Sequence, residues 1–178
     1  MADIEGFGNL FAEIDNLASD LQDKSVIAGF VEGANYSDGT PIAAVAATQN
    51  FGTERIPPRP FMTNAIDHHE NEWIEELSEL IKDGRSFDDA LSAVGLLMQS
   101  DIKEAIIDIT SPELAPLTMM IRKIKKERSQ VGMPTTPEIF KAAILRLKEG
   151  DSDFGGVNDK PLVDSGNMLN HVEFEVRK

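Results

Sequence analysis

The sequence predicts an α+β fold in which a small, mostly antiparallel sheet packs against several long helices. Apolar residues recur at helical spacing through most of the chain, whereas strand patterns are confined to residues 25–33 and 172–176. Between these two regions, Pro57, Pro58 and Pro60 interrupt the helical pattern. The chain has 178 residues, 41% of them apolar, so we expect a single domain over residues 1–178.

The first elements follow from local residue patterns. A β-rich apolar run predicts a strand over residues 25–33. Thr40 is expected to cap a helix over residues 42–51, with Pro41 at its first position. An amphipathic N-terminal helix over residues 7–22 is predicted by apolar side chains at helical spacing: Phe7, Leu10, Phe11, Ile14, Leu17 and Leu21.

Residues 50–61 are predicted to form a stiff connector, which we call the proline connector. Pro57, Pro58 and Pro60 fix their φ angles and remove three backbone donors. The residue before each proline is pushed toward extended geometry. The segment therefore cannot be a helix or a central strand. We also expect Gly52 to end the preceding helix with a positive φ, which only glycine adopts at low cost.

The second half of the chain is predicted to be mainly helical. Ser86, with Asp89 three residues later, resembles a capping box at the start of the longest apolar pattern. A glycine- and aspartate-rich stretch over residues 150–159 indicates a mobile loop. The final strand should place Val172, Phe174 and Val176 inward. The predicted helices cover residues 62–82, 87–109, 112–128 and 137–147.

Composition excludes several classes of chemistry. The chain has no cysteine, which removes disulfides, thiolate metal sites and cysteine nucleophiles. A net charge of −14 argues against a general nucleic-acid-binding surface. No apolar run is long enough to span a membrane, and the N-terminal residues are acidic where a signal peptide would be basic. We expect no cofactor, no metal and no catalytic residue.

Two motifs nevertheless suggest chemistry. Residues 162–166 match the Asp-Ser-Gly signature of aspartic proteases, but that mechanism needs two carboxylates and the chain has one copy. A tight turn at Asp164, Ser165 and Gly166 is the favoured interpretation. The adjacent His68 and His69 point to different faces of a helix, which disfavours a shared metal ion.

A basic cluster stands out in this acidic chain. Three interpretations apply, in decreasing order of preference. The first is a solvated helix end, favoured by the helix dipole. The second is contact with an acidic neighbour, including an identical subunit, and the third is contact with DNA in a central channel. The cluster consists of Arg122, Lys123, Lys125, Lys126 and Arg128.

The proline connector is the main basis for a family resemblance. Phe51, Gly52 and Thr53, followed by Ile56, Pro57, Pro58, Arg59, Pro60 and Phe61, resemble a signature of tailed-bacteriophage tail completion proteins. These are also called neck, virion morphogenesis, head–tail connector or minor tail proteins. The family pattern continues with a long helix and, near the C-terminus, with a segment that Lys160, Pro161, Leu162, Val163, Asp164, Ser165 and Gly166 match here. Both motifs occur in the family's order.

The resemblance implies a non-enzymatic virion protein that forms a ring, often hexameric, between the head connector and the tail tube. Its implied partners are further copies of itself, the head connector, and tail tube or tail terminator proteins. Contact with DNA in the channel is not favoured. The implied location is the neck or tail of the virion, and the host cytoplasm during assembly. Arg59 would anchor the connector to carboxylates or to carbonyls at an oligomer contact, and Phe61 would enter the core.

The resemblance covers residues 25–114 and 158–178, and residues 115–157 are longer than the family pattern, which suggests a helical insertion. The candidate contact elements are the connector, residues 158–166 and the basic cluster. Two alternatives stay open. One is a small phage-encoded hydrolase or protease that uses Asp164, and the other is an accessory binding domain that never enters the virion.

Overall fold

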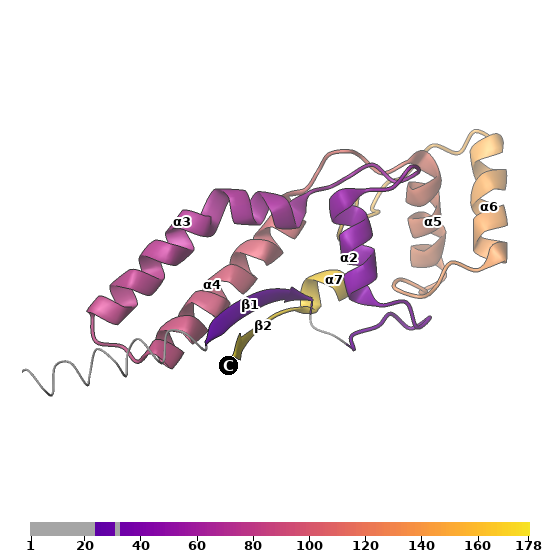
Figure 1. Ribbon diagram of the computed structural model, residues 1–178. Coiled ribbons are helices and arrows are strands. Elements are labelled where there is room, and N and C mark those ends of the chain that lie inside the picture. The colour runs from indigo at the N-terminus through magenta and orange to yellow at the C-terminus, as the bar shows by residue number, and fades with distance from the viewer. Residues whose placement is uncertain (1–23, 31–32) are drawn as a thin grey trace, which may run out of the picture.

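The computed structural model describes residues 24–30 and 33–178, and the predicted helix over residues 7–22 lies outside them. Within the described part of the chain, six helices accompany one two-stranded antiparallel sheet. The predicted α+β class is therefore confirmed. Figure 1 shows an elongated arrangement, with the sheet against two long helices at one end and a pair of shorter helices at the other.

The sheet joins the two predicted strand regions. β1 (Ser25–Phe30) pairs with β2 (Val172–Arg177), so that Ser25 faces Arg177 and Phe30 faces Val172. Gly33 already lies outside the strand, which is shorter than the predicted range. Along β2, Val172 is fully buried while Glu173 and Glu175 are exposed, which confirms the predicted alternation.

A pair of long helices lies beside the sheet, with the second helix in contact with the strands and the first packed on the second. α3 (Phe61–Lys82) and α4 (Phe87–Asp108) form a hairpin, and α4 packs against both strands (Figure 1). The predicted cap is confirmed, because Ser86 Oγ accepts a hydrogen bond from the Asp89 amide at 3.2 Å. Gly95 allows the close approach of α4 and β2, since a Cβ there would lie 2.3 Å from Cδ2 of Phe174.

α2 (Ile42–Phe51) matches its predicted range, but its N-terminal cap does not. The cap residue is Pro41, in extended conformation. The predicted cap, Thr40, lies one residue before it in a turn. The Thr40 amide donates to Asp38 Oδ1 at 2.9 Å, and the Thr40 carbonyl accepts from the Tyr36 amide at 2.9 Å. These turn contacts keep Thr40 out of the helix.

The region predicted as an insertion forms two helices with an apolar cluster of their own. α5 (Pro116–Glu127) begins later than predicted, because its cap residue Ala115 is extended and Pro116 occupies a first-turn position. α6 (Pro137–Lys148) begins at the predicted Thr136 cap, whose Oγ1 accepts from the Ile139 amide at 3.4 Å. The shared cluster comprises Met120, Ile124, Ile139 and Ala143.

The remaining chain from α6 to β2 contains only α7 (Asn167–Asn170), a short turn that the sequence analysis did not predict. Residues 150–159 form a loop without regular structure, as expected. In the described residues, no helix combines the length and apolarity that a membrane span requires. The main core lies between the sheet, α2, α3, α4 and the segment before α7, and its buried residues are Ile42, Ala46, Phe61, Ala65, Ile102, Ile106, Leu162, Met168 and Val172.

Candidate functional site

The proline connector is an ordered bend between α2 and α3. Residues 52–60 contain no helix or strand, as predicted, whereas residues 50 and 51 belong to α2 and residue 61 begins α3, so the predicted connector was too long at both ends. Gly52 has φ +73°, which confirms the expected positive φ. Just beyond it, the Thr53 amide donates to the Ile56 carbonyl at 2.8 Å, and Thr53 Oγ1 accepts from the Ile56 amide at 3.1 Å. Thr53 thus closes a small loop, and the three prolines that follow it lead into α3.

Asn50 caps α3 from the preceding helix. Its Oδ1 accepts from the amides of Met62 at 3.0 Å and Thr63 at 3.4 Å, and its Nδ2 donates to Thr63 Oγ1 at 3.1 Å. The α3 cap position is Pro60, whose side chain has no polar atom, so the first amides need an acceptor from elsewhere. This role of Asn50 was not predicted, although a helix that begins after proline without a capping side chain is a usable signal.

Replacing Asn50 with alanine should lower the free energy of unfolding by about 1–2 kcal/mol, the usual cost of losing a helix cap. Asn50 is only 4% exposed, so water cannot easily replace its side chain. Asn50→Asp is the matched control, because it keeps the accepting oxygen and should cost less than Asn50→Ala. Urea denaturation of the three proteins measures the difference. Equal losses for both variants would show that the cap does not stabilise α3.

Arg59 fastens the connector to the loop between α4 and α5. Its Nε donates to the Pro112 carbonyl at 3.0 Å, and its Nη2 to the Glu113 carbonyl at 3.2 Å. Its Nη1 donates to Gln49 Oε1 at 3.1 Å. Burial lowers the pKa of the Arg59 guanidinium. The acceptors were predicted to be carboxylates or carbonyls at an oligomer contact, but within the described residues they belong to this chain itself.

Phe61 follows Arg59 and enters the core as expected, with 1% of its surface exposed. Its ring meets Phe30 edge-on, with the ring centroids 6.1 Å apart. The connector is therefore anchored in two ways, by a guanidinium on backbone carbonyls and by an aromatic ring in the main core.

We expect Arg59→Ala to cost about 2–3 kcal/mol of unfolding free energy, because three charge-assisted hydrogen bonds disappear from a nearly buried site. Glu113 is exposed and Pro112 is half-buried, so water can partly replace the lost donors. Arg55→Ala, at an exposed position of the same connector, should change stability by less than about 0.5 kcal/mol. Thermal and urea denaturation compare the two. An unchanged stability in Arg59→Ala would show that its contacts do not hold the connector.

The late bend, residues 158–166, is gathered around Arg122 of α5. Its Nη1 donates to the carbonyls of Asn158 at 2.8 Å, Lys160 at 2.9 Å and Val163 at 3.3 Å. Its Nη2 donates to the Pro161 carbonyl at 3.2 Å. One side chain therefore collects four carbonyls of a single bend. Burial is the main cause that lowers the pKa of Arg122.

The preferred interpretation of the basic cluster, a solvated helix end, is wrong for most of its members. Arg122 is 8% exposed and Lys125 is 7% exposed. Lys125 Nζ donates to the Met133 carbonyl at 2.6 Å. Lys123 Nζ lies 3.3 Å from Asp151 Oδ1, and Lys126 donates to the Gly156 carbonyl. Arg128 is exposed. Arg122, Lys123 and Lys126 thus fasten the late bend and the loop over residues 150–159 to α5.

Other residues of the late bend also reach inward. Lys160 Nζ donates to the Ile107 carbonyl in the last turn of α4 at 2.8 Å. Leu162 belongs to the main core. Gly166 has φ +79°, and the Asn167 amide donates to Ser165 Oγ at 3.4 Å, which is the tight turn that the sequence predicted. The predicted insertion is thus tied to the rest of the chain through this bend.

Asp164 lies beside a cavity of about 270 Å³ that Tyr36 and Asp38 also line. The nearest charged partner of Asp164 is Arg122, whose Nε lies 3.4 Å from Oδ1. A protease dyad would share a proton and raise a carboxyl pKa. The pKa of Asp38 is instead lowered, mainly by the hydrogen bond from the Thr40 amide. The arrangement around Asp164 is that of an ion pair at a turn.

The two adjacent histidines have separate partners. His68 Nδ1 lies 2.6 Å from the Asn64 carbonyl oxygen, and His69 Nδ1 lies 3.1 Å from Glu72 Oε2. The hydrogen bond to Glu72 raises the pKa of His69. Across residues 24–30 and 33–178, no group of three or more His, Cys, Asp or Glu side chains is placed to hold a metal ion.

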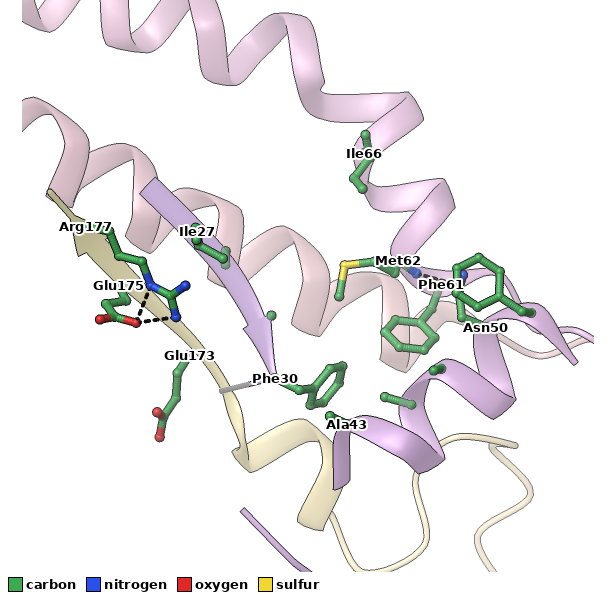
Figure 2. Close-up of a pocket in the computed structure, with 15 residues that line it drawn as sticks. Ile27, Phe30, Ala43, Asn50, Phe61, Met62, Ile66, Glu173, Glu175 and Arg177 are labelled. Atoms are coloured by element: carbon green, nitrogen blue, oxygen red, sulfur yellow. Dashed lines mark hydrogen bonds and ion pairs between the residues drawn. The ribbon is translucent and has the colours of Figure 1, made fainter. Parts of the chain in front are cut away.

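An apolar groove lies between β1, α2 and α3 of the described residues, and we call it the apolar groove (Figure 2). Its volume is about 480 Å³. Ile27 of β1 is 45% exposed, Ile66 of α3 is 42% exposed, and Phe51 at the end of α2 is 76% exposed. Glu175 and Arg177 of β2 form an ion pair at one border of the groove, as Figure 2 shows. Phe51 was predicted as a contact residue, but the groove was not predicted.

Comparison of the chain with protein-family models, with curated proteins and with solved structures found no match.

Proposed function

We propose that this chain is a structural subunit of a tailed bacteriophage, acting in tail completion and head–tail joining as part of an oligomeric ring at the neck. The observation that carries the proposal is the presence of two motifs in the family's order. The first spans residues 51–61 and the second spans residues 160–166. A long helix, α3, follows the first motif directly, and the last strand, β2, follows the second after a short turn.

The internal contacts of both motifs support an assembly role. Arg59 and Arg122 donate hydrogen bonds to backbone carbonyls of their own chain. These bonds hold the backbone of each motif in one conformation. A segment that is already rigid loses little conformational freedom when it docks. The connector then presents Phe51, a large apolar side chain at 76% exposure, at the surface. Exposed aromatic side chains are frequent anchors of protein interfaces.

The proposed partners are identical subunits, the head connector on one face and tail tube or tail terminator proteins on the other. The charge of −14 favours a soluble free subunit and requires basic partner surfaces or local neutralisation in the ring. A DNA-facing role for the basic cluster has weaker support, because Lys123, Lys125 and Lys126 bind groups of this chain.

Peptide mass spectrometry of purified particles from the phage or prophage that encodes the chain tests this proposal. We expect several copies per particle, in a fixed ratio to the head connector. Absence from infectious particles would overturn the proposal and favour an accessory domain that stays outside the virion.

A surface variant sharpens the same experiment. Phe51→Asp should keep the thermal stability of the subunit, because this side chain is largely exposed, and should abolish incorporation into particles. Arg55→Asp, at an exposed position of the same connector, is the matched control and should be incorporated normally. Normal incorporation of Phe51→Asp would show that the connector does not form the assembly contact.

A further inference from the structure

We propose that α6 of one subunit docks into the apolar groove of the next subunit, so that identical copies associate head to tail. The inference rests on the oligomeric ring of the proposed function and names the two surfaces that meet in it. It combines an apolar hollow that has acidic residues at its borders with a helix that exposes apolar and basic side chains. Both surfaces consist of described residues.

The apolar groove combines an apolar lining with acidic borders. Ile27 and Ile66 stand on its two sides (Figure 2), and each exposes more than two fifths of its surface. Glu173 of β2 lines the groove and is exposed. Glu70 is exposed one helical turn beyond Ile66, on the same face of α3. A contiguous apolar hollow marks an interaction surface, and its carboxylates favour a partner that carries cations.

α6 has the complementary character. It packs on α5 through its buried side, and the opposite side is open. On that side Phe140 is 45% exposed and Leu145 is 56% exposed. Lys141 and Lys148 share this side, because residues three and four positions apart are neighbours on a helix, and both lysines are exposed. The helix therefore offers apolar side chains for the groove and cations for its borders.

Charge favours a second copy as the occupant. The chain carries a net charge of −14, so most pairs of its surfaces repel each other. Lys141 and Lys148 form no ion pair with any described residue, and neither do Glu70 and Glu173. Placing the two lysines against the two carboxylates of the next subunit replaces repulsion by attraction and selects one register of docking.

The arrangement of the fold makes the contact intermolecular. Figure 1 shows α6 at the opposite end of the molecule from the sheet and the α3–α4 hairpin. α6 has 12 residues and is about 18 Å long, and the six residues of β1 cover about 20 Å, so the helix matches the length of that side of the groove. The two surfaces differ, so the contact is head to tail, and contacts of this type build rings when the rotation closes.

The same docking explains the role proposed for Phe51. This side chain lines the groove and is 76% exposed in the single subunit. The neighbouring α6 covers it only on assembly. Phe51→Asp therefore leaves the subunit stable and places a carboxylate where the apolar side chains of α6 dock.

Disulfide cross-linking of the full chain tests the contact, because the chain has no native cysteine. Ile66→Cys and Leu145→Cys are purified separately and mixed, so that only a contact between subunits can join them. We expect a covalent dimer from the mixture on mild oxidation and little from either variant alone. A chain with both substitutions should form a ladder of covalent oligomers that ends at a closed ring. Equal linking in a single variant alone would overturn the head-to-tail arrangement.

Leu96→Cys is the matched control for Ile66→Cys. Leu96 is 56% exposed, but it lies on α4 outside the groove lining. It should link to Leu145→Cys only at the level of random collision. Equal yields for Ile66→Cys and Leu96→Cys, or no link at the highest protein concentration reached, would overturn the proposal.

Charge reversal gives an independent readout. Lys141→Glu with Lys148→Glu should lower the yield of the disulfide between positions 66 and 145 about tenfold, because like charges then face each other. Glu70→Lys with Glu173→Lys in the subunit that supplies the groove should restore the yield. Arg128→Glu changes an exposed cation outside both surfaces and should have no effect. An unchanged yield in the double lysine variant would contradict the proposed docking.

Mass spectrometry of particles separates this inference from the neck role. If the chain is present in particles but positions 66 and 145 link neither there nor in solution, the docking is wrong and the neck role stands. If the two positions link in solution but the chain is absent from particles, the docking stands and the neck role is wrong.

Discussion

Gly52→Ala should lower the free energy of unfolding by about 3 kcal/mol, as the sum of backbone strain and a steric clash. The φ of +73° at Gly52 is unfavourable for any residue with a Cβ. The added Cβ would also lie 2.8 Å from both the Ile56 carbonyl oxygen and the Pro58 nitrogen. Both neighbours are backbone atoms of the connector, so neither can move without displacing the bend.

Gly39→Ala separates the two contributions. Gly39 has φ +84°, but no atom lies within 4 Å of its added Cβ. It should therefore lose only the strain, about 1 kcal/mol. Urea denaturation of both variants and the native chain gives the comparison. Similar losses at the two positions would show that the connector bends freely around Gly52 and is not a fixed shape.

Arg122→Met should produce the largest loss, about 3–5 kcal/mol, because it removes the nearly buried donor that four buried or part-buried carbonyls share. The carbonyls of residues 158, 160, 161 and 163 then lose their hydrogen bonds to this side chain, and Asp164 loses its partner. Methionine keeps most of the side-chain volume, so the change reports the hydrogen bonds and charge more than the packing.

Arg128→Met is the control for Arg122→Met, since Arg128 belongs to the same basic cluster but is exposed. It should change stability by less than about 0.5 kcal/mol. Hydrogen exchange should also show faster exchange across residues 158–166 in Arg122→Met and no change in Arg128→Met. Equal behaviour of the two variants would contradict the view that Arg122 holds the late bend.

Local signals predicted the elements well. Ser86 and Thr136 mark the starts of α4 and α6, and Gly52 ends α2, because caps and glycine conformations depend on a few neighbouring residues. The pairing of β1 with β2 was only implied, as the sequence showed two strand patterns and no other partner. The cap of α2 was misplaced by one residue, because Asp38 and Tyr36 hold Thr40 in a turn.

The candidate site depended on contacts that local patterns do not encode. Arg122 is 36–41 residues away from the carbonyls that it binds, so its charge alone suggested an exposed helix end. Arg59 was expected to act as an anchor, but its acceptors lie in a loop more than 50 residues later. The apolar groove arises where β1, α2 and α3 meet, and no single segment carries a signal for it.

Electron microscopy of particles assembled without this chain tests the proposed role most directly. The gene is deleted in the phage or prophage that encodes it, and particles are imaged with and without complementation by the native chain. The account predicts DNA-filled heads without tails beside free tails, with joined particles restored by the native chain. Normally tailed particles in the deletion strain would contradict it.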